Sequence, residues 1–256
     1  MDDFINPAVQ GTLGLLKSAS KSPSVKRVVI TSSIAVLDLE KASDISGRFP
    51  SLFGLIKGNV KLTHQTAYDL GPIPPLDKLT TPFAGYVASK RVALKKTNEF
   101  VEQNKPGFDI IHVLPSVILG RNELTTTLPE FDSGTNRYVI NIAKGETAPA
   151  PMLGASVFVD DCAEVHVQAL NSKVQGNQNF IASSGAVVFN DVNEIVKEAF
   201  GSTEKSVLKL GGNLATKALD LNTRETDDAF HIRWASFPEQ VKSVIGHYLE
   251  VVGDEA

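Results

Sequence analysis

The chain has 256 residues, of which 42% are hydrophobic and 21% charged, and its formal net charge is −4. This composition is typical of a folded globular protein, and no basic cluster indicates binding to nucleic acid or to an anionic membrane surface. No stretch approaches the roughly 20 apolar residues that span a bilayer. The acidic start, Met1-Asp2-Asp3-Phe4, lacks the apolar core of a signal peptide.

The cysteine and histidine content narrows the class of protein further. Cys162 is the single cysteine, which excludes an internal disulfide and fits a reducing compartment. The five histidines are scattered and show no metal-ligand spacing, so no metal site is predicted. We therefore expect a cytoplasmic protein that binds no metal.

A short helix and a buried strand are predicted at the start of the chain. The helix is expected over Pro7–Ala19, because proline suits a first helical turn. The run Lys26–Ser33 is rich in β-branched residues without alternation, which is typical of a parallel strand buried on both faces. Ligands of parallel sheets lie beyond the carboxyl ends of the strands. Ser32 and Ser33 therefore stand where a ligand would lie, although capping of the local loop is the alternative.

A long connection separates this strand from the next elements. Residues 36–82 are repeatedly broken by proline and glycine, with one possible helical turn at Ser51–Ile56. The 3.6-residue period then predicts an amphipathic helix from about Pro82 to Asn104. Phe108–Leu114 is a second buried strand, and Pro115 is expected to turn the chain out over the sheet edge. This order of elements predicts a right-handed βαβ unit.

Two residues on the predicted helix carry chemistry. Tyr86 and Lys90 are one turn apart and share a face of the helix. An ammonium favours the ionised form of a nearby phenol, and such a phenol can exchange a proton with an oxygen near neutral pH. The spacing alone is a weak signal, because most such pairs in any sequence are solvated helix positions.

Several motifs together resemble one family. Thr31-Ser32-Ser33 after a strand, Tyr86-x-x-x-Lys90 on a helix and Pro115-Ser116-Val117 after the next strand resemble the extended short-chain dehydrogenase/reductase superfamily. The resemblance is strongest to its fungal dihydroflavonol-reductase-like and cinnamoyl-CoA-reductase-like branch, also described as NAD-dependent epimerase/dehydratase. Asn6–Leu13 and Gly154–Asp161 resemble the same branch. The resemblance implies an α/β fold with a Rossmann-like parallel sheet, helices on its faces and a smaller C-terminal substrate-binding lobe.

The resemblance also implies a role for each motif residue. Ser33 would orient a substrate carbonyl, and Tyr86 would protonate its oxygen as hydride arrives from NADPH. Lys90 would favour the ionised phenol and hold the nicotinamide ribose. Pro115, Ser116 and Val117 would lie against the nicotinamide ring. The implied function is NADPH-dependent reduction of a ketone or aldehyde in a small molecule, within fungal secondary metabolism.

One departure from the family pattern qualifies this function. The family begins with a Gly-x-x-Gly-x-x-Gly turn whose backbone N–H groups hold the pyrophosphate, and Gly11-Thr12-Leu13-Gly14 has the wrong spacing for it. We expect roughly 80 residues of the family's first half to be absent. An unpaired sheet edge beside the 26–33 strand would then invite a dimer or another partner. The alternatives are a cofactor-deficient remnant, a partner-dependent subunit, or an epimerase or dehydratase of the same fold.

The domain organisation follows from the same resemblance. Residues 1–121 are expected to be the remaining part of the dinucleotide-binding domain. Residues 122–256 are expected to be mostly substrate-binding lobe, with segments at about 155–190 returning to the main sheet.

Further elements are predicted in the second half of the chain. A helix is expected within Glu130–Lys144 and a strand over Ala155–Val159. A helix to Leu170 follows, capped by Asp160 or Asp161 rather than carrying an acid–base dyad, with Cys162 as a buried, inert thiol in its first turn. The last predictions are a strand over Asn179–Ser184, an Asn190-capped helix to Phe200, a possible helix over Leu214–Leu219, and a final helix opened by a capping box at Ser236–Glu239.

Overall fold

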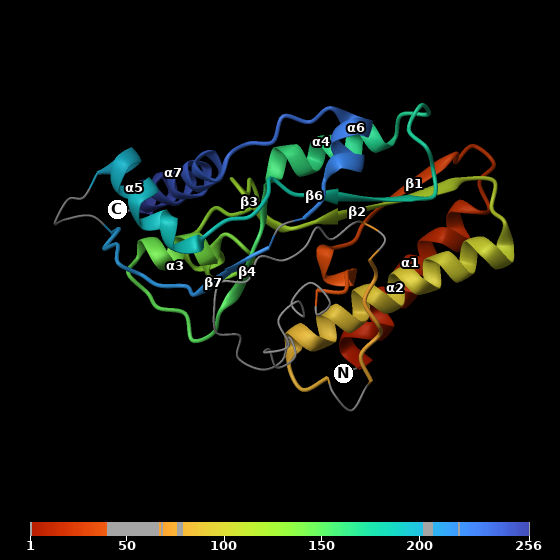
Figure 1. Cartoon of the computed structure of the whole chain (residues 1–256), viewed down its shortest axis with the longest axis horizontal. Helices are drawn as coiled ribbons and strands as arrows, with labels where there is room; N and C mark the ends of the chain where they lie inside the picture. The colour runs from red at the N-terminus through yellow and green to blue at the C-terminus, as the bar shows by residue number, and fades with distance from the viewer. Residues whose placement is uncertain are drawn as a thin grey trace.

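The computed structural model describes residues 2–39, 67, 69–75, 79–201, 207–219 and 221–255. It is a mixed α/β structure in which all of the named strand pairs are parallel (Figure 1). The predicted fold class is confirmed. The helical turn expected at Ser51–Ile56 lies outside the described residues.

The main sheet has three strands in the order β1-β2-β6. They are β1 (Arg27–Thr31), β2 (Asp109–Pro115) and β6 (Gln178–Ala182), so all three strands lie within the predicted regions or one residue from them. Among the described residues β1 forms an edge of this sheet. The carboxyl ends of β1 and β2 therefore meet on one side of the molecule, where the hydroxyl residues after β1 emerge.

The prediction that Pro115 turns the chain out of the sheet is wrong. Pro115 is the last residue of β2 and pairs with Ala182 of β6. Successive residues of a strand direct their backbone N–H and C=O groups to opposite sides. The carbonyl of Val113 accepts a hydrogen bond from Ser32 N–H on the β1 side, whereas Ser116 N–H donates to the carbonyl of Ala182 on the β6 side. The N–H that proline lacks would point toward β1, beyond the end of that strand at Thr31. Proline therefore removes no ladder bond here.

Two smaller parallel pairs extend the structure toward the C-terminal half. Strand β3 (Val117–Leu119) pairs with β5 (Ser156–Phe158), and β4 (Met152–Gly154) pairs with β7 (Thr216–Ala218). The helix suggested over Leu214–Leu219 is therefore wrong. Its apolar spacing fits a helix, but pairing with β4 decides the local conformation, as tertiary context often does.

Helices α1 (Asp2–Ala19) and α2 (Pro82–Asn104) lie side by side against one face of the main sheet (Figure 1). The bounds of α2 match the prediction. The start of α1 does not, because the helix begins five residues earlier and Pro7 lies inside it. The missing proline N–H removes one hydrogen bond near the helix end, and the packing of α1 along α2 offsets that loss.

Local signals explain why α2 begins and ends where it does. The side chain of Thr81 accepts a hydrogen bond from Ala84 N–H at 3.1 Å, and Pro82 occupies the first turn. At the other end Lys105 adopts the left-handed conformation with φ 43° and closes the helix on the carbonyl of Val101. Both caps are local, so the helix that carries Tyr86 and Lys90 is defined by its own sequence.

The opposite face of the main sheet is covered by α4 (Val159–Ala169) and α6 (Arg224–Phe230) (Figure 1). The prediction of an aspartate cap on α4 is wrong, because Phe158 occupies the cap position without a side-chain bond. The Asp161 carboxylate instead accepts a hydrogen bond from Ala235 N–H at 2.7 Å. The carboxylate that could have capped α4 is therefore used to hold the segment between α6 and the last helix.

A second apolar core lies among α3 (Arg137–Ala143), α5 (Val192–Phe200) and α7 (Phe237–Glu255). The predicted capping box of α7 is confirmed by reciprocal bonds between Ser236 and Glu239. The apolar stripe of this helix belongs to the core, and its buried members include Val241, Val244, Ile245 and Tyr248.

One helix prediction in this region is confirmed and one is wrong. The helix expected within Glu130–Lys144 is α3, and Gly134 at φ +69° separates it from a 3₁₀ turn at Leu128–Asp132. Asn190 does not cap α5; it lies in a preceding 3₁₀ turn, and its side-chain oxygen accepts from Leu214 N–H at 2.8 Å. Gly134 and Asn190 thus stabilise the connecting segments before α3 and α5 and do not cap either helix.

One arginine holds the starts of β1 and β2 together. Arg27 and Asp109 are directly paired in the register and form a bidentate ion pair, with N···O distances of 2.5 and 2.8 Å. The same guanidinium donates to the carbonyls of Ala169, Asn171 and Val174 after α4. All five guanidinium N–H groups therefore have an acceptor, which is the full capacity of the side chain.

We expect Asp109→Asn to destabilise the protein by about 3 kcal/mol, because it leaves a largely buried guanidinium without its counter-charge. Urea unfolding followed by circular dichroism measures this. The matched control is Lys96→Met, which removes a partly exposed ion pair to Glu99 and should change stability by less than about 1 kcal/mol. Equal effects of the two substitutions would contradict the conclusion that the Arg27–Asp109 ion pair contributes more to stability than an exposed pair.

A buried histidine lies in the centre of the main sheet. His112 on β2 is 4% exposed, and its Nε2 has no hydrogen-bond partner among the described residues. Burial lowers its pKa to about 4, opposed by a hydrogen bond with Asn179 on β6. The unfolded chain would bind a proton at about pH 6.5, so the two states take up protons at different pH values.

Stability should therefore fall as the pH is lowered from about 6.5 to 4, since only the unfolded state binds the proton in that window. The contribution of His112 is about 3 kcal/mol over the whole window. Denaturant midpoints measured across this range should fall more steeply for the unchanged protein than for His112→Gln. Parallel curves would show that this histidine does not titrate between the two states.

Among the described residues, no helix combines the length and the apolar content that are needed to cross a bilayer.

Candidate functional site

Ser33 lies just beyond the carboxyl end of β1. It caps a short 3₁₀ turn, Ile34–Val36, and its hydroxyl oxygen accepts a hydrogen bond from Ala35 N–H at 3.1 Å. The local capping role considered from sequence is therefore present. Accepting this bond still leaves the hydroxyl one proton to donate. Ser33 is half-buried, so its hydroxyl combines a fixed position with partial exposure.

Tyr86 and Lys90 lie in the second and third turns of α2. The Lys90 ammonium is 5.8 Å from the centre of the Tyr86 ring, a cation–π distance. It also donates to the carbonyl of Thr31, the last residue of β1, at 3.4 Å. One ammonium thus links the helix that carries Tyr86 to the strand end that leads into Ser33.

The environment of Lys90 changes its acidity. The side chain is half-buried, and burial lowers the pKa of its ammonium. A desolvated ammonium interacts more strongly with nearby negative charge than a solvated one. Lys90 is therefore suited to stabilise a phenolate or a ligand oxygen beside it.

The third predicted segment, Pro115-Ser116-Val117, lies at the junction of β2 and β3. Pro115 ends β2, and Val117 begins β3 and packs against the core of the C-terminal half. The hydroxyl of Ser116 is buried and donates to the carbonyl of Ala182 on β6 at 3.3 Å. The backbone of this segment lies beside the end of β1, but the Ser116 hydroxyl is used within the sheet.

The acidic and thiol residues at the start of α4 do not form a second reactive site. Burial raises the pKa of the Asp161 carboxyl, which is bonded to a backbone N–H. Burial also raises the pKa of the Cys162 thiol to about 11, so the thiol stays protonated at neutral pH. The expectation of a buried, inert cysteine is confirmed by its burial and raised pKa.

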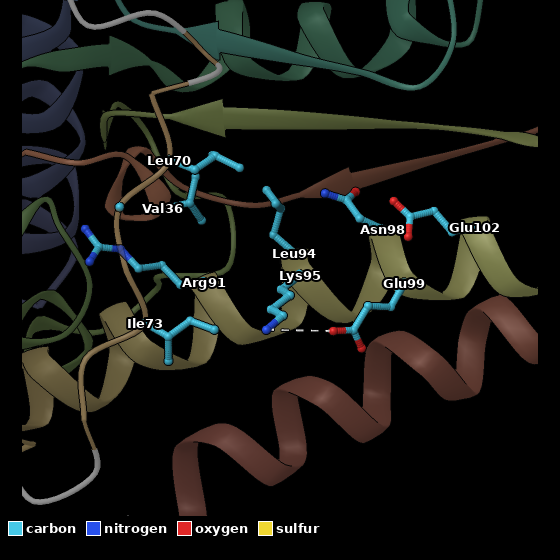
Figure 2. A pocket seen from close by; sticks show the side chains of 10 residues that line it. Val36, Leu70, Ile73, Arg91, Leu94, Lys95, Asn98, Glu99 and Glu102 are labelled. Carbon is cyan, nitrogen blue, oxygen red and sulfur yellow. Dashed lines mark ion pairs between the residues drawn. The ribbon is translucent and has the colours of Figure 1, made fainter.

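Two cavities lie apart from these residues. One of about 460 Å³ runs along α2 from Arg91 to Glu102, with Lys95 and Glu99 at its rim (Figure 2). Another of about 600 Å³ lies near the ends of β3 and β5, beside Gly120. Neither is lined by a predicted site residue. The elements that carry the predicted residues thus adjoin at the carboxyl end of β1, outside both of these cavities.

Sequence reasoning missed Arg91, which follows Lys90 directly. Its guanidinium donates to backbone carbonyls of the segment after Ser33 and of the segment around Pro72. The periodicity of α2 gave no reason to single this residue out, because its acceptors are backbone atoms that have no sequence signature. A bulky cation immediately after Lys90 was the only available signal.

The fold and these residues together define a Rossmann-like protein with a Ser, Tyr and Lys set at the carboxyl edge of its sheet. No protein-family model matches the chain. Ketoreductase CTB6 from Cercospora nicotianae is 29% identical over 262 aligned positions, covering 97% of this chain and 68% of the relative. The NAD-dependent epimerase/dehydratase ALT6 from Alternaria alternata is 27% identical, covering 94% of this chain and 68% of the relative.

Solved structures show the same fold. Yeast methylglyoxal/isovaleraldehyde reductase Gre2, complexed with NADPH, superposes with a TM-score of 0.74 at 23% identity, over 97% of this chain and 71% of that one. Vestitone reductase from alfalfa gives a TM-score of 0.69 at 21% identity, over 98% and 73% of the two chains. The chain is therefore similar in sequence to fungal ketoreductases and NAD-dependent epimerase/dehydratases, and it shares the fold of these reductases.

Proposed function

We propose that this protein reduces a ketone or aldehyde group of a small molecule with NADPH, with Tyr86 as the proton donor. The observation that carries the proposal is the position of the Lys90 ammonium between the Tyr86 ring and the end of β1. The relatives named as ketoreductases and as a methylglyoxal/isovaleraldehyde reductase support the reaction class. We also propose a place in fungal secondary metabolism, which the resemblance to the fungal branch implies, and in the cytoplasm, which the single cysteine favours.

The residues at the sheet edge suit the nicotinamide end of the cofactor. Lys90 carries three N–H donors and directs one at Thr31, so others can serve a ribose hydroxyl. Pro115 ends β2 and Val117 begins β3, so both lie near the carboxyl end of β1, to which the Lys90 ammonium donates. NADPH, when bound, would supply a hydride to the carbonyl carbon.

The remaining steps belong to the side chains of this protein. Ser33 donates its hydroxyl proton in a hydrogen bond to the carbonyl oxygen and so orients the substrate. Tyr86 transfers its phenolic proton to that oxygen as negative charge develops there. The Lys90 ammonium then stabilises the phenolate that remains. The products are the alcohol and a tyrosinate that regains its proton from solvent.

The organisation of the chain is proposed on the same basis. Residues 1–121 would form the dinucleotide-binding part and residues 122–256 mostly the substrate-binding lobe. The β1 edge is where a strand of a second chain would add, because an edge strand presents unpaired backbone groups. These assignments rest on the family pattern and on the strand order.

Replacing Tyr86 by Phe should reduce turnover by roughly 10²- to 10⁴-fold, because the proton donor is removed while the ring is kept. The measurement is NADPH consumption with methylglyoxal and with isovaleraldehyde, with circular dichroism to verify folding. Tyr138→Phe is the control, since Tyr138 lies on α3 beside Phe189 and outside this site. Unchanged turnover in Tyr86→Phe would show that Tyr86 is only a packed helix residue.

We expect NADPH to bind only weakly, with saturation above the micromolar range. The printed sequence has no Gly-x-x-Gly-x-x-Gly turn, and hydrogen bonds to charged acceptors contribute about 1.5–3 kcal/mol each. Fluorescence titration of NADPH with the 256-residue chain measures the affinity, with Lys90→Met as a weaker-binding comparison. Saturation at micromolar NADPH would contradict this expectation.

A further inference from the structure

Arg91 on α2 bonds to two other segments, the turn after Ser33 and the segment around Pro72. Its Nε donates to the carbonyl of Ala35 at 3.1 Å and its Nη2 to the carbonyl of Leu37 at 2.5 Å. Its Nη1 donates to the carbonyl of Pro72 at 2.6 Å. Figure 2 shows the side chain leaving α2 and passing between Leu70 and Ile73.

Two of these acceptors lie two and four residues after Ser33. Ser33 caps the turn that contains Ala35, and its hydroxyl accepts from the N–H of that same residue. The bonds from Arg91 to Ala35 and Leu37 therefore fix the turn to α2 on both sides of its last residue, Val36. Since Lys90 is the preceding residue of α2, the turn that presents Ser33 is tied to the helix that presents Lys90.

The third acceptor belongs to a strap, defined here as residues 69–73. The strap is held on the turn by Gly71 N–H to Val36 O at 2.8 Å and by Asp38 N–H to Asp69 O. A Cβ at Gly71 would lie 2.2 Å from the guanidinium of Arg91. The glycine therefore leaves the space in which the guanidinium reaches the carbonyl of Pro72.

Arginine suits this position better than lysine. The guanidinium is planar and offers five N–H donors in a fixed fork, so it can hold several carbonyls at once in a defined geometry. A lysine ammonium has three freely rotating donors at a single point and would not span acceptors on both the turn and the strap.

We propose that Arg91 is a positioning residue that holds the Ser33 hydroxyl in place beside Lys90 and Tyr86. It acts on backbone carbonyls and touches neither substrate nor cofactor. The proposal rests on the proposed function for its kinetic consequence, but the geometry that it describes can be tested without any turnover.

The kinetic test compares Arg91→Lys, Arg91→Met and Gly71→Ala with the unchanged protein. All three should lower kcat by about 10- to 100-fold, because small misplacements of a catalytic group have effects of that size. KM for isovaleraldehyde and for NADPH should change less than about threefold, since no ligand contact is removed. Lys95→Met, which removes an exposed cation one turn further along α2, should leave kcat unchanged.

The geometric test places a thiol at the position of the serine hydroxyl. In Ser33→Cys, the pH dependence of alkylation by iodoacetamide reports the thiol pKa, which a nearby ammonium lowers. Adding Lys90→Met should raise that pKa, and adding Arg91→Met or Gly71→Ala should raise it as well. Cys162 adds little background, because it is buried and burial raises its pKa to about 11.

The outcomes separate this inference from the proposed function. No reduction of either aldehyde by the unchanged protein would count against the proposed function, and the thiol profile would still decide the role of Arg91. A profile that Lys90→Met shifts but Arg91→Met and Gly71→Ala do not would overturn the positioning role. A profile insensitive to Lys90→Met would overturn it too, because Ser33 would not then lie beside Lys90. Should Arg91→Met fail to fold, Arg91→Lys and Gly71→Ala carry the test.

Discussion

The register between β1 and β2 is the constraint on which the site depends. It pairs Arg27 with Asp109 at one end and Thr31 with Val113 at the other. The Arg27–Asp109 ion pair opposes a slip of either strand, and Gly176 leaves room for it, since a Cβ there would lie 2.1 Å from the carboxylate. A one-residue slip would exchange the two faces of a strand. It would also move the hydroxyl residues after β1 relative to Pro115 at the end of β2.

The sequence predicted best those elements whose signals are local. The bounds of α2 follow from Thr81, Pro82 and the apolar period, all of which lie within or next to the helix. The prediction of a helix at Leu214–Leu219 was wrong because pairing with β4, more than sixty residues away, decides the conformation of this segment. The prediction of a helix cap at Asp160 or Asp161 was wrong for a related reason. The Asp161 carboxylate accepts a hydrogen bond from Ala235 N–H, a partner that no spacing rule identifies.

The same division applies to the candidate site. Tyr86, Lys90 and Ser33 could be named from sequence because each belongs to a short motif. What holds them relative to one another could not, since the acceptors are backbone carbonyls of Thr31, Ala35 and Leu37, which every residue possesses. Backbone acceptors become specific only when the fold brings them together. A motif therefore identifies the reacting groups, and only the structure identifies what positions them.

Two arginines act at the two ends of β1 by the same physical means. At its start Arg27 holds β2 and the segment after α4; beyond its end Arg91 holds the turn after Ser33 and the strap. Each supplies several directional N–H donors from one rigid group, where a lysine would supply a single point charge. An edge strand has backbone partners on one side only, so it resists displacement less than a central strand. In an edge strand that leads directly into a candidate catalytic serine, cross-links at both ends are what keep the serine in register with the helix that carries Tyr86 and Lys90.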